Sequence, residues 1–566
     1  MSEEFIADKL AKEHRSISVA EFFERNKHML GFSNNTKALI TCVREAVDNA
    51  LDACEDARIL PKIYVELKEI DDEVFRVIIE DNGPGIKKKN IPNIFAKLLY
   101  GSKFNLKQSR GQQGIGISAA VLYAQLSTGR TTKIYSRIGD GKTHIFKLRI
   151  NVSSNEPEIL SDETIKADGR GTRIELTVRG RYIKGRQSIE EYIKQTAIMN
   201  PYAQVVFVDP QGQQFEFSRV VDALPIEAKS IKLHPHGLEI GILMRMLKNT
   251  EARNLVLFFT SEFSRVGRNT AVQICTKSGL DTKMKPTTLS RTDTESLFKA
   301  IKKVNIQAPQ TDCLSPVGAE AIKKGLKKEM NPEFISVISR PPAVYSGYPF
   351  QIEVGLGYGG DLDKEGPIHL IRYANKVPLI YEQSACSITR AVLKSNWKRY
   401  GIQQSKNSFP TGPLAVVIHI VSVWVPYTSE GKEAIASYDD ILKEINLAIQ
   451  EAARKMKIYI SKKVKIKEAE ARKKIFHIYC TDVIDALANI TDHPRQKIED
   501  GFNALINEKM KAFEVDLTNA GKGVEIQEEF ITGIKSDSIS NSEEQTIDTE
   551  EKQTEPIQDN DEEVVQ

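Results

Sequence analysis

Three short stretches in the first 120 residues decide the fold: Arg44-Glu45-Ala46-Val47-Asp48-Asn49-Ala50-Leu51-Asp52-Ala53, Asp81-Asn82-Gly83-Pro84-Gly85-Ile86 and Gly111-Gln112-Gln113-Gly114-Ile115-Gly116-Ile117-Ser118. The first lies in a predicted helix over about 35–56, because apolar residues recur there on one face. The second follows a predicted strand at 75–80, and the third leads into an apolar helix at 117–125. Each stretch alone is a weak signal, so their order and spacing carry the argument.

In this order and at this spacing, the three stretches resemble the N-box and the two Gly boxes of the GHKL (Bergerat-fold) ATPases. That superfamily includes type II topoisomerase ATPase domains, mismatch-repair MutL, the large heat-shock chaperones and sensor histidine kinases. A fourth stretch, Gly171-Thr172-Arg173-Ile174, resembles the third box, whose threonine supports an aspartate beside the adenine. The resemblance implies an α+β domain that binds ATP and Mg²⁺.

Glu45 and Asn49 are four residues apart on one helix, so both project from the same face. In a GHKL site Glu45 is the candidate general base for the water that attacks the γ-phosphate. Asn49 can offer an amide oxygen to Mg²⁺, which completes its octahedron with water and phosphate oxygens. In isolation, this spacing would more often mark a capping pair or a solvated helix face.

Asp81 ends a strand, and a carboxylate there can accept a hydrogen bond from the adenine amine. Gly83 and Gly85 let the backbone approach a ring closely. The alternative is a Pro-Gly turn without a ligand. The loop before the apolar helix presents amide N–H groups suited to a phosphate chain, and its candidate binding residues are Gly111, Gln112, Gln113, Gly114, Ile115, Gly116, Ile117 and Ser118. Ser102 and Lys103 lie where a family lid would touch the nucleotide.

The segment Val423-Trp424-Val425-Pro426-Tyr427-Thr428-Ser429-Glu430-Gly431-Lys432-Glu433-Ala434 resembles a strand-to-loop element of the transducer domain that follows the ATPase domain in topoisomerases and MutL. That element delivers a lysine into the nucleotide site. Lys432 is the matching residue, a compact cation able to stabilise charge on the γ-phosphate. The alternative is a solvated surface lysine.

Between the two α+β blocks, residues 236–304 are helical in pattern and strongly basic. This insert resembles the helix-two-turns-helix domain of type IIB topoisomerase B subunits. Its candidate DNA contacts are Arg265, Arg268, Lys277, Lys283, Lys285 and Arg291, which suit phosphates. The chain shows no cleavage constellation, so the resemblance implies an A subunit that cuts duplex DNA, an A₂B₂ heterotetramer and an ATP-dependent B–B homodimer. The alternative is a GHKL clamp acting on a protein client or in mismatch repair.

The expected fold is α+β and multidomain. It comprises an N-terminal strap (1–30), a Bergerat-fold GHKL ATPase domain (31–228), a helix-two-turns-helix domain (229–306) and a ribosomal S5-like transducer domain (307–470). C-terminal helices that dock the A subunit (471–530) and a disordered acidic tail (531–566) follow. An unusually long helical pattern runs from about 438 to 490. The literal GxGxxG at 355–360 lacks a following helix, which favours a β-hairpin tip over a dinucleotide site.

Charge separates the body of the chain from its end. The whole chain carries +3, while residues 535–566 hold eleven acidic and two basic residues, which leaves the body near +12. A basic body permits nucleic-acid binding. No apolar run approaches the roughly 18–20 residues of a membrane helix, and the first residues lack the basic start of a signal peptide. The sequence therefore predicts a cytoplasmic, nucleoid-associated protein without a membrane partner.

Overall fold

The computed structural model describes residues 14, 16–102, 105–111, 114–429, 431–491 and 493–505. They belong to two units, residues 1–491 and residues 492–566, and each is considered by itself. The acidic tail and the candidate site residues Lys103, Gln112 and Gln113 lie outside the described residues.

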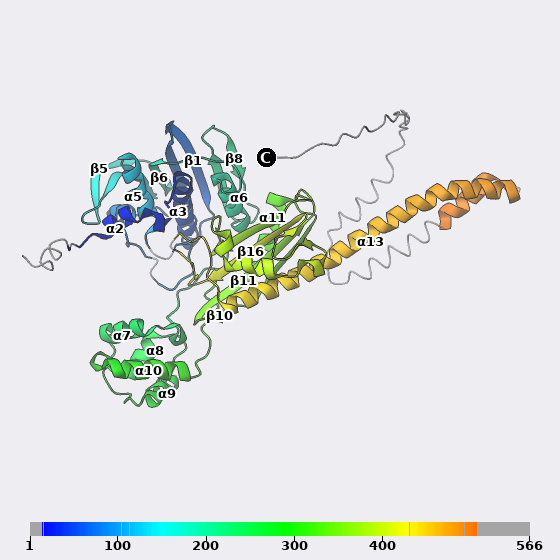
Figure 1. The fold of residues 1–566 in the computed structure, drawn as a ribbon. Helices are drawn as coiled ribbons and strands as arrows, with labels where there is room; N and C mark the ends of the chain where they lie inside the picture. Colours follow the sequence, from blue (N-terminus) through cyan, green and yellow to red (C-terminus); the bar gives the residue numbers. More distant parts are fainter. Residues whose placement is uncertain are drawn as a thin grey trace, which may run out of the picture. The chain divides into compact units, whose positions relative to one another are not determined.

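The N-terminal domain is built on an eight-stranded sheet with the order β5-β4-β3-β6-β2-β1-β7-β8. Only the β1–β7 pairing is parallel among the registers of this sheet. The helices that pack against it include α3 (Asn35–Asp56), α5 (Gly116–Thr128) and α6 (Ile189–Met199) (Figure 1). The strands are β1 (Lys62–Asp71), β2 (Val74–Asp81), β3 (Thr132–Ile138), β4 (Lys142–Asn151), β5 (Glu156–Lys166), β6 (Arg170–Arg179), β7 (Gln204–Val208) and β8 (Gln214–Phe217).

Helix α3 has the bounds that its apolar periodicity predicts. The Asn34 side chain caps its first turn by accepting a hydrogen bond of 2.9 Å from the Lys37 N–H. Leu39, Val43 and Leu51 on its buried face have no exposed surface, so the helix forms the centre of the domain core. Because α3 is anchored along its whole length, the polar side chains that it carries are held in fixed positions.

The N-terminal arm contains a short helix, α2 (Val19–Arg25), capped by Ser18. Val19 and Phe23 pack against the core of the ATPase domain of the same chain, as the apolar pattern predicts for an anchor. Phe22 on the same helix stays 40% exposed. The arm therefore presents one apolar ring outward while its neighbours hold it to the domain.

The basic insert is a separate helical cluster of α7 (Ile240–Asn249), α8 (Leu255–Glu262), α9 (Arg268–Ser278) and α10 (Arg291–Lys303) (Figure 1). Its core consists of apolar side chains from these four helices, including Phe258, Phe259 and Leu297. A capping box at Ser290 and Asp293 starts α10. The insert thus has a core of its own, as expected for a small domain.

A second sheet with the order β10-β11-β16-β12-β13 forms the following α+β block, and β9 also pairs with β11. Its strands are β9 (Phe334–Ser339), β10 (Ala343–Tyr345), β11 (Tyr348–Tyr358), β12 (His369–Ala374), β13 (Val377–Pro378) and β16 (Leu414–Ser422). Around it lie α11 (Ala319–Met330), α12 (Ser387–Lys394) and the first part of α13 (Asp439–Thr491).

The prediction of a β-hairpin tip at 355–360 is wrong. Gly355 and Gly357 lie inside β11, and the next strand, β12, is separated from β11 by β16. Glycine is needed there for packing, because a Cβ at Gly355 would lie 2.9 Å from the Leu326 side chain.

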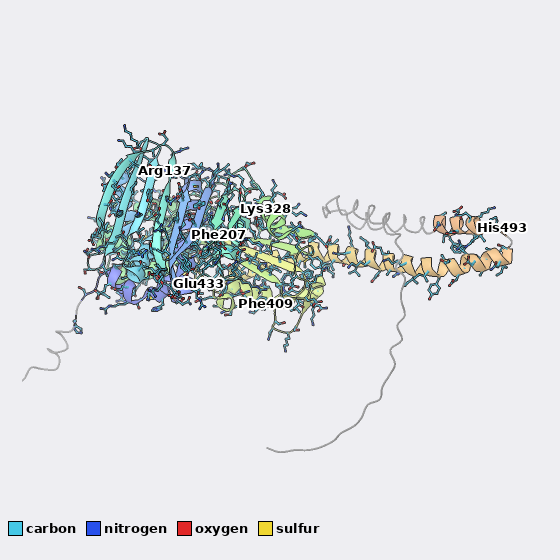
Figure 2. The ribbon with its side chains drawn as sticks, turned by 90° about the horizontal axis from the view of Figure 1, so that it is seen from above. Arg137, Phe207, Lys328, Phe409, Glu433 and His493 are labelled. Atoms are coloured by element: carbon cyan, nitrogen blue, oxygen red, sulfur yellow. The ribbon has the colours of Figure 1, made fainter. Side chains whose placement is uncertain are left out.

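Helix α13 spans 53 residues without a break, so the boundary expected between 470 and 471 falls inside one helix. Its first part packs on β9 and β11. Beyond about residue 461 most of its side chains are exposed, and Figure 2 shows them projecting on several sides of the helix. In the described part of the chain, no helix is long and apolar enough to cross a membrane. Residues 495–505 of the second unit form a helix of their own.

Candidate functional site

A cavity of about 550 Å³ opens between α3, the end of β2, the start of α5 and a loop of the second α+β block. It gathers residues from all four sequence boxes and from the predicted lysine loop. The predicted site residues that line it are Glu45, Asn49, Asp81, Gly85, Ser102, Gly111, Gly114, Ile115, Gly116, Ile117, Thr172 and Lys432. Residues almost 400 positions apart in the sequence thus meet in one cavity.

Glu45 is held between two cations. Arg44 Nη2 lies 3.2 Å from Oε1, and Lys432 Nζ lies 3.4 Å from Oε2 and 3.5 Å from Oε1. Burial raises the pKa of Glu45, but Lys432 and Arg44 outweigh burial and leave the pKa below its ordinary value. Glu45 is therefore a carboxylate at neutral pH, the form that a general base requires.

Asp81 is fixed by backbone donors from the turn that follows it and from strand β6. The N–H groups of Gly83 and Thr172 donate to Oδ1 over 2.8 and 3.2 Å, so the threonine supports the aspartate through its backbone. Both bonds reach the same oxygen, which leaves Oδ2 to accept from a ligand. Burial raises the pKa of Asp81 to about 6, although the two N–H donors lower it. Above that pH the side chain is an acceptor without a proton.

The glycine loop ends in the start of α5, whose N-cap Ile115 has no side-chain capping bond within the described residues. The first N–H groups of such a helix suit an anion, and the helix dipole adds to the attraction. Gly114 has a φ of +64°, which glycine adopts without strain. A Cβ at Gly116 would lie 2.0 Å from Glu45 Oε2, so any larger residue at this position would displace the carboxylate.

Lys432 reaches the cavity from a loop that leaves the second sheet after β16. The loop is closed by an isolated bridge between Tyr427 and Ile435 and by the Thr428 N–H, which donates to Ala434 O over 2.9 Å. Lys432 has a φ of +52°, an uncommon conformation for a side chain with a Cβ. Backbone strain at a residue that enters a cavity is typical of a functional position.

Of the predicted residues that the structure describes, two do not line the cavity. Gly83 acts through its N–H on Asp81, and Ser118 is buried, where its Oγ donates to Ile115 O over 2.9 Å. The sequence reasoning missed lining residues between β2 and the lid, among them Ile86, Asn90, Ile94, Phe95 and Tyr100. The spacing of Ile91, Ile94 and Phe95 was a usable signal, because apolar residues at i, i+3 and i+4 indicate a helix, and α4 (Ile91–Ala96) follows the Asp81 turn.

The chemistry of the donors decides how a metal would be held here. The described residues contain no group of three or more His, Cys, Asp or Glu side chains that could hold a metal ion. Asn49 brings a single amide oxygen to the cavity wall. These donors fit Mg²⁺ only if phosphate oxygens and water supply its other ligands, which is how this ion usually binds with nucleotides.

The six residues of the insert that were predicted to contact DNA are all exposed: Arg265, Arg268, Lys277, Lys283, Lys285 and Arg291. Arg291 lies 3.1 Å from Glu295, and Lys277 donates to the Lys303 carbonyl over 3.0 Å. Neither contact buries the charge, so these side chains remain accessible to a polyanion.

Two family models match the chain. The family described as "Histidine kinase-, DNA gyrase B-, and HSP90-like ATPase" matches residues 34–182, and the family described as "Topoisomerase VI B subunit, transducer" matches residues 309–473. The first match contains the four boxes and the second contains Lys432. The predicted GHKL ATPase fold and the transducer domain are thereby confirmed.

Curated relatives extend these matches over most of the chain. The B subunit of type 2 DNA topoisomerase 6 from Methanococcoides burtonii is 51% identical and covers 85% of this chain and 78% of that protein. The B subunit from Methanosarcina barkeri is 51% identical, and the match covers 86% of this chain and 79% of that protein. The B subunit from Pyrococcus furiosus is 37% identical, and the match covers 88% of this chain and 96% of that protein. With this identity over this length, the chain belongs to the family of type 2 DNA topoisomerase 6 B subunits.

Proposed function

We propose that this chain is the ATP-binding and ATP-hydrolysing subunit of a type II DNA topoisomerase. The observation that carries the proposal is the meeting of Lys432, from the transducer, with Glu45, from the ATPase helix α3, in a cavity that also holds Asp81. In this arrangement the hydrolytic site is complete only when both domains contribute. ATP turnover is therefore coupled to the position of the transducer.

Different walls of the cavity contact the adenine, the phosphates, the metal ion and the attacking water. Asp81 accepts a hydrogen bond from the adenine amine, and the N–H groups at the start of α5 hold the phosphates. Asn49 is the protein ligand for Mg²⁺, which would neutralise phosphate charge. Glu45 orients the attacking water and takes its proton. Ser102 lines the same cavity, and Lys103, Gln112 and Gln113 stay predictions of nucleotide contact.

Lys432 has two roles. Its ammonium group pairs with Glu45 and lowers the pKa of that carboxyl. When a γ-phosphate is bound, the lysine stabilises the charge that develops on it during transfer. An exchange of one anionic partner for another would make the transducer respond to the presence of the γ-phosphate.

ATP-driven dimerisation through the N-terminal domain would close a gate around DNA. Phe22, exposed on the otherwise anchored arm, supports a contact with a second copy. A two-fold contact is the commonest arrangement of a soluble homo-oligomer. The exposed basic residues of α9 and α10 would contact phosphates of the duplex, and their exposure supports that role.

In this proposal a partner A subunit cleaves the DNA, while this chain supplies the ATPase. We place the contact with the A subunit of an A₂B₂ assembly on the distal part of α13 and the residues after it. Exposed apolar side chains on α13 support this surface: Ile475, Ile478, Tyr479, Val483 and Ile490. A nucleoid location follows from action on DNA.

Strand passage with purified components tests the proposal. The full chain, mixed with a cleaving A subunit, Mg²⁺ and ATP, should relax supercoiled DNA, and duplex DNA should stimulate its ATPase. Glu45→Gln should bind nucleotide and fail in both assays. A clamp acting on a protein client would ignore duplex DNA, so ATP turnover that DNA leaves unchanged would refute the topoisomerase function.

A further inference from the structure

A second lysine of the transducer also forms an ion pair with helix α3. Lys376 Nζ lies 2.8 Å from Glu55 Oε2, and the Lys376 side chain is only 4% exposed. Glu55 lies ten residues after Glu45 on the same helix, which separates the two carboxylates along the axis by about 15 Å. The transducer thus forms ion pairs with α3 at three points: Lys432–Glu45 inside the cavity, Glu433–Lys37 in the first turn of the helix, and Lys376–Glu55 outside the cavity.

The Lys376–Glu55 contact belongs to a buried group of two cations and two carboxylates. Arg110 forms ion pairs with Asp52, over 2.7 Å, and with Glu55, and its side chain is 2% exposed. Burial raises the pKa of Glu55, yet Arg110 and Lys376 bring it down to about 2, so Glu55 is charged at every working pH. Separating charges in such a group would leave them buried without compensation, which makes this contact hard to break.

The same contact ties the phosphate loop to the transducer. Arg110 directly precedes Gly111, which lines the cavity. The Ser109 carbonyl accepts a hydrogen bond of 3.0 Å from Asn375 Nδ2, and Gln108 exchanges two hydrogen bonds of 2.9 and 2.7 Å with Ser315. The three residues that lead into the loop are therefore attached to helix α3 or to the transducer.

The turn that presents Lys376 is strained, and a hydrogen-bonded pair of His419 and Glu353 holds it in place. Asn375 and Lys376 have φ values of +46° and +69°, in the left-handed region that side chains with a Cβ rarely adopt. The Lys376 N–H donates to His419 Nε2 over 2.9 Å, so the proton of the neutral imidazole must be on Nδ1, which faces Glu353 at 2.9 Å. Glu353 also accepts from the Val317 and Gly318 N–H groups. Such bracing keeps the lysine in place despite the strain.

We propose that Lys376 is a positioning residue of the ATPase: its pairing with Glu55 fixes the transducer on α3 and so sets where Lys432 meets Glu45. The contrast between the two lysines supports this division. Lys376 makes a short, buried contact in a neutral cluster, whereas Lys432 makes longer contacts of 3.4 and 3.5 Å at a cavity wall. In this division, Lys376–Glu55 is the fixed contact, called the pivot below. Lys432–Glu45 is the contact that is exchanged when Lys432 turns to the γ-phosphate. This inference rests on the proposed ATPase function.

A double-mutant cycle on the full chain separates positioning from simple stabilisation. Lys376→Met removes the pivot charge and leaves Glu55 paired with Arg110. A displacement of about 1 Å at the reacting groups can cost up to about a hundredfold, so we expect kcat to fall at least tenfold. The KM for ATP should stay within about twofold, and in a Lys432→Ala background the added effect on kcat should also stay within about twofold. Lys376→Arg, which keeps the charge, should recover most of the activity.

The matched control is Lys463→Met, which removes an ion pair with Glu333 that does not involve the ATPase domain. Thermal unfolding and binding of an ATP analogue verify that each variant is folded. If Lys376→Met does not fold, Glu55→Gln removes the other partner and should give the same loss in kcat.

Normal kcat in Lys376→Met, or losses that multiply with those of Lys432→Ala, would overturn the inference while leaving the proposed function intact. A wild-type chain that hydrolyses no ATP would overturn the proposed function instead.

Discussion

Adding one methyl group at Gly116 should strongly slow hydrolysis while leaving the fold almost unchanged. The new Cβ would lie 2.0 Å from Glu45 Oε2 and 2.8 Å from Cδ. Real Cβ atoms essentially never approach another heavy atom closer than 3.0 Å, so the carboxylate must move by at least about 1 Å. Since the obstructing atoms form the end of a flexible side chain, the movement is inexpensive for folding. For catalysis, a misplacement of this size can cost about a hundredfold.

Gly116→Ala should therefore lower kcat for ATP about a hundredfold, with an analogue affinity close to that of the wild type. Steady-state ATPase measurements and titration with a non-hydrolysable analogue provide the two numbers. Gly241→Ala is the matched control, because a Cβ at Gly241 in α7 meets nothing within 4 Å. Wild-type turnover in Gly116→Ala would refute the assignment of Glu45 as the base. Equal losses of affinity and kcat would indicate a damaged phosphate loop instead.

Three further changes test other parts of the site. Lys432→Ala removes a cation that lowers the pKa of Glu45, so the acid limb of the kcat–pH profile should move to higher pH; a profile with an unmoved limb would exclude contact between the two groups in solution. Asp81→Asn would place an amide donor where the adenine amine needs an acceptor, and ATP affinity should fall about tenfold or more, the effect of an unpaired buried polar group. In the wild type, affinity should weaken as pH falls through about 6, where Asp81 takes up a proton, and Asp81→Asn should lack this dependence. A chain ending at Glu468 loses the exposed apolar side chains of distal α13; it should keep its ATPase, and co-elution of this chain with the A subunit would show that the docking surface lies elsewhere.

Local sequence was enough for the elements that carry the chemistry. The apolar repeat of α3 and the strand that ends at Asp81 were predicted because their periodicity follows from burial against a single core. The four boxes resemble GHKL motifs because a nucleotide needs a few particular groups at short spacings on one helix, one turn and one loop. The long helix α13 was predicted for the same reason, since few breaking residues interrupt its pattern.

Tertiary structure decided how distant segments meet. No local pattern brings Lys432 within 3.4 Å of Glu45, because that distance depends on how the transducer packs against the ATPase domain. Arg110 and Lys376 were missed entirely: a lone charged residue in a sequence is indistinguishable from a surface residue until folding buries it beside Glu55. The glycine at 116 is likewise explained only by the carboxylate that folding places beside it. Short-range spacing determined which groups the chain can offer a nucleotide. Long-range packing decided which charged side chains form ion pairs with one another.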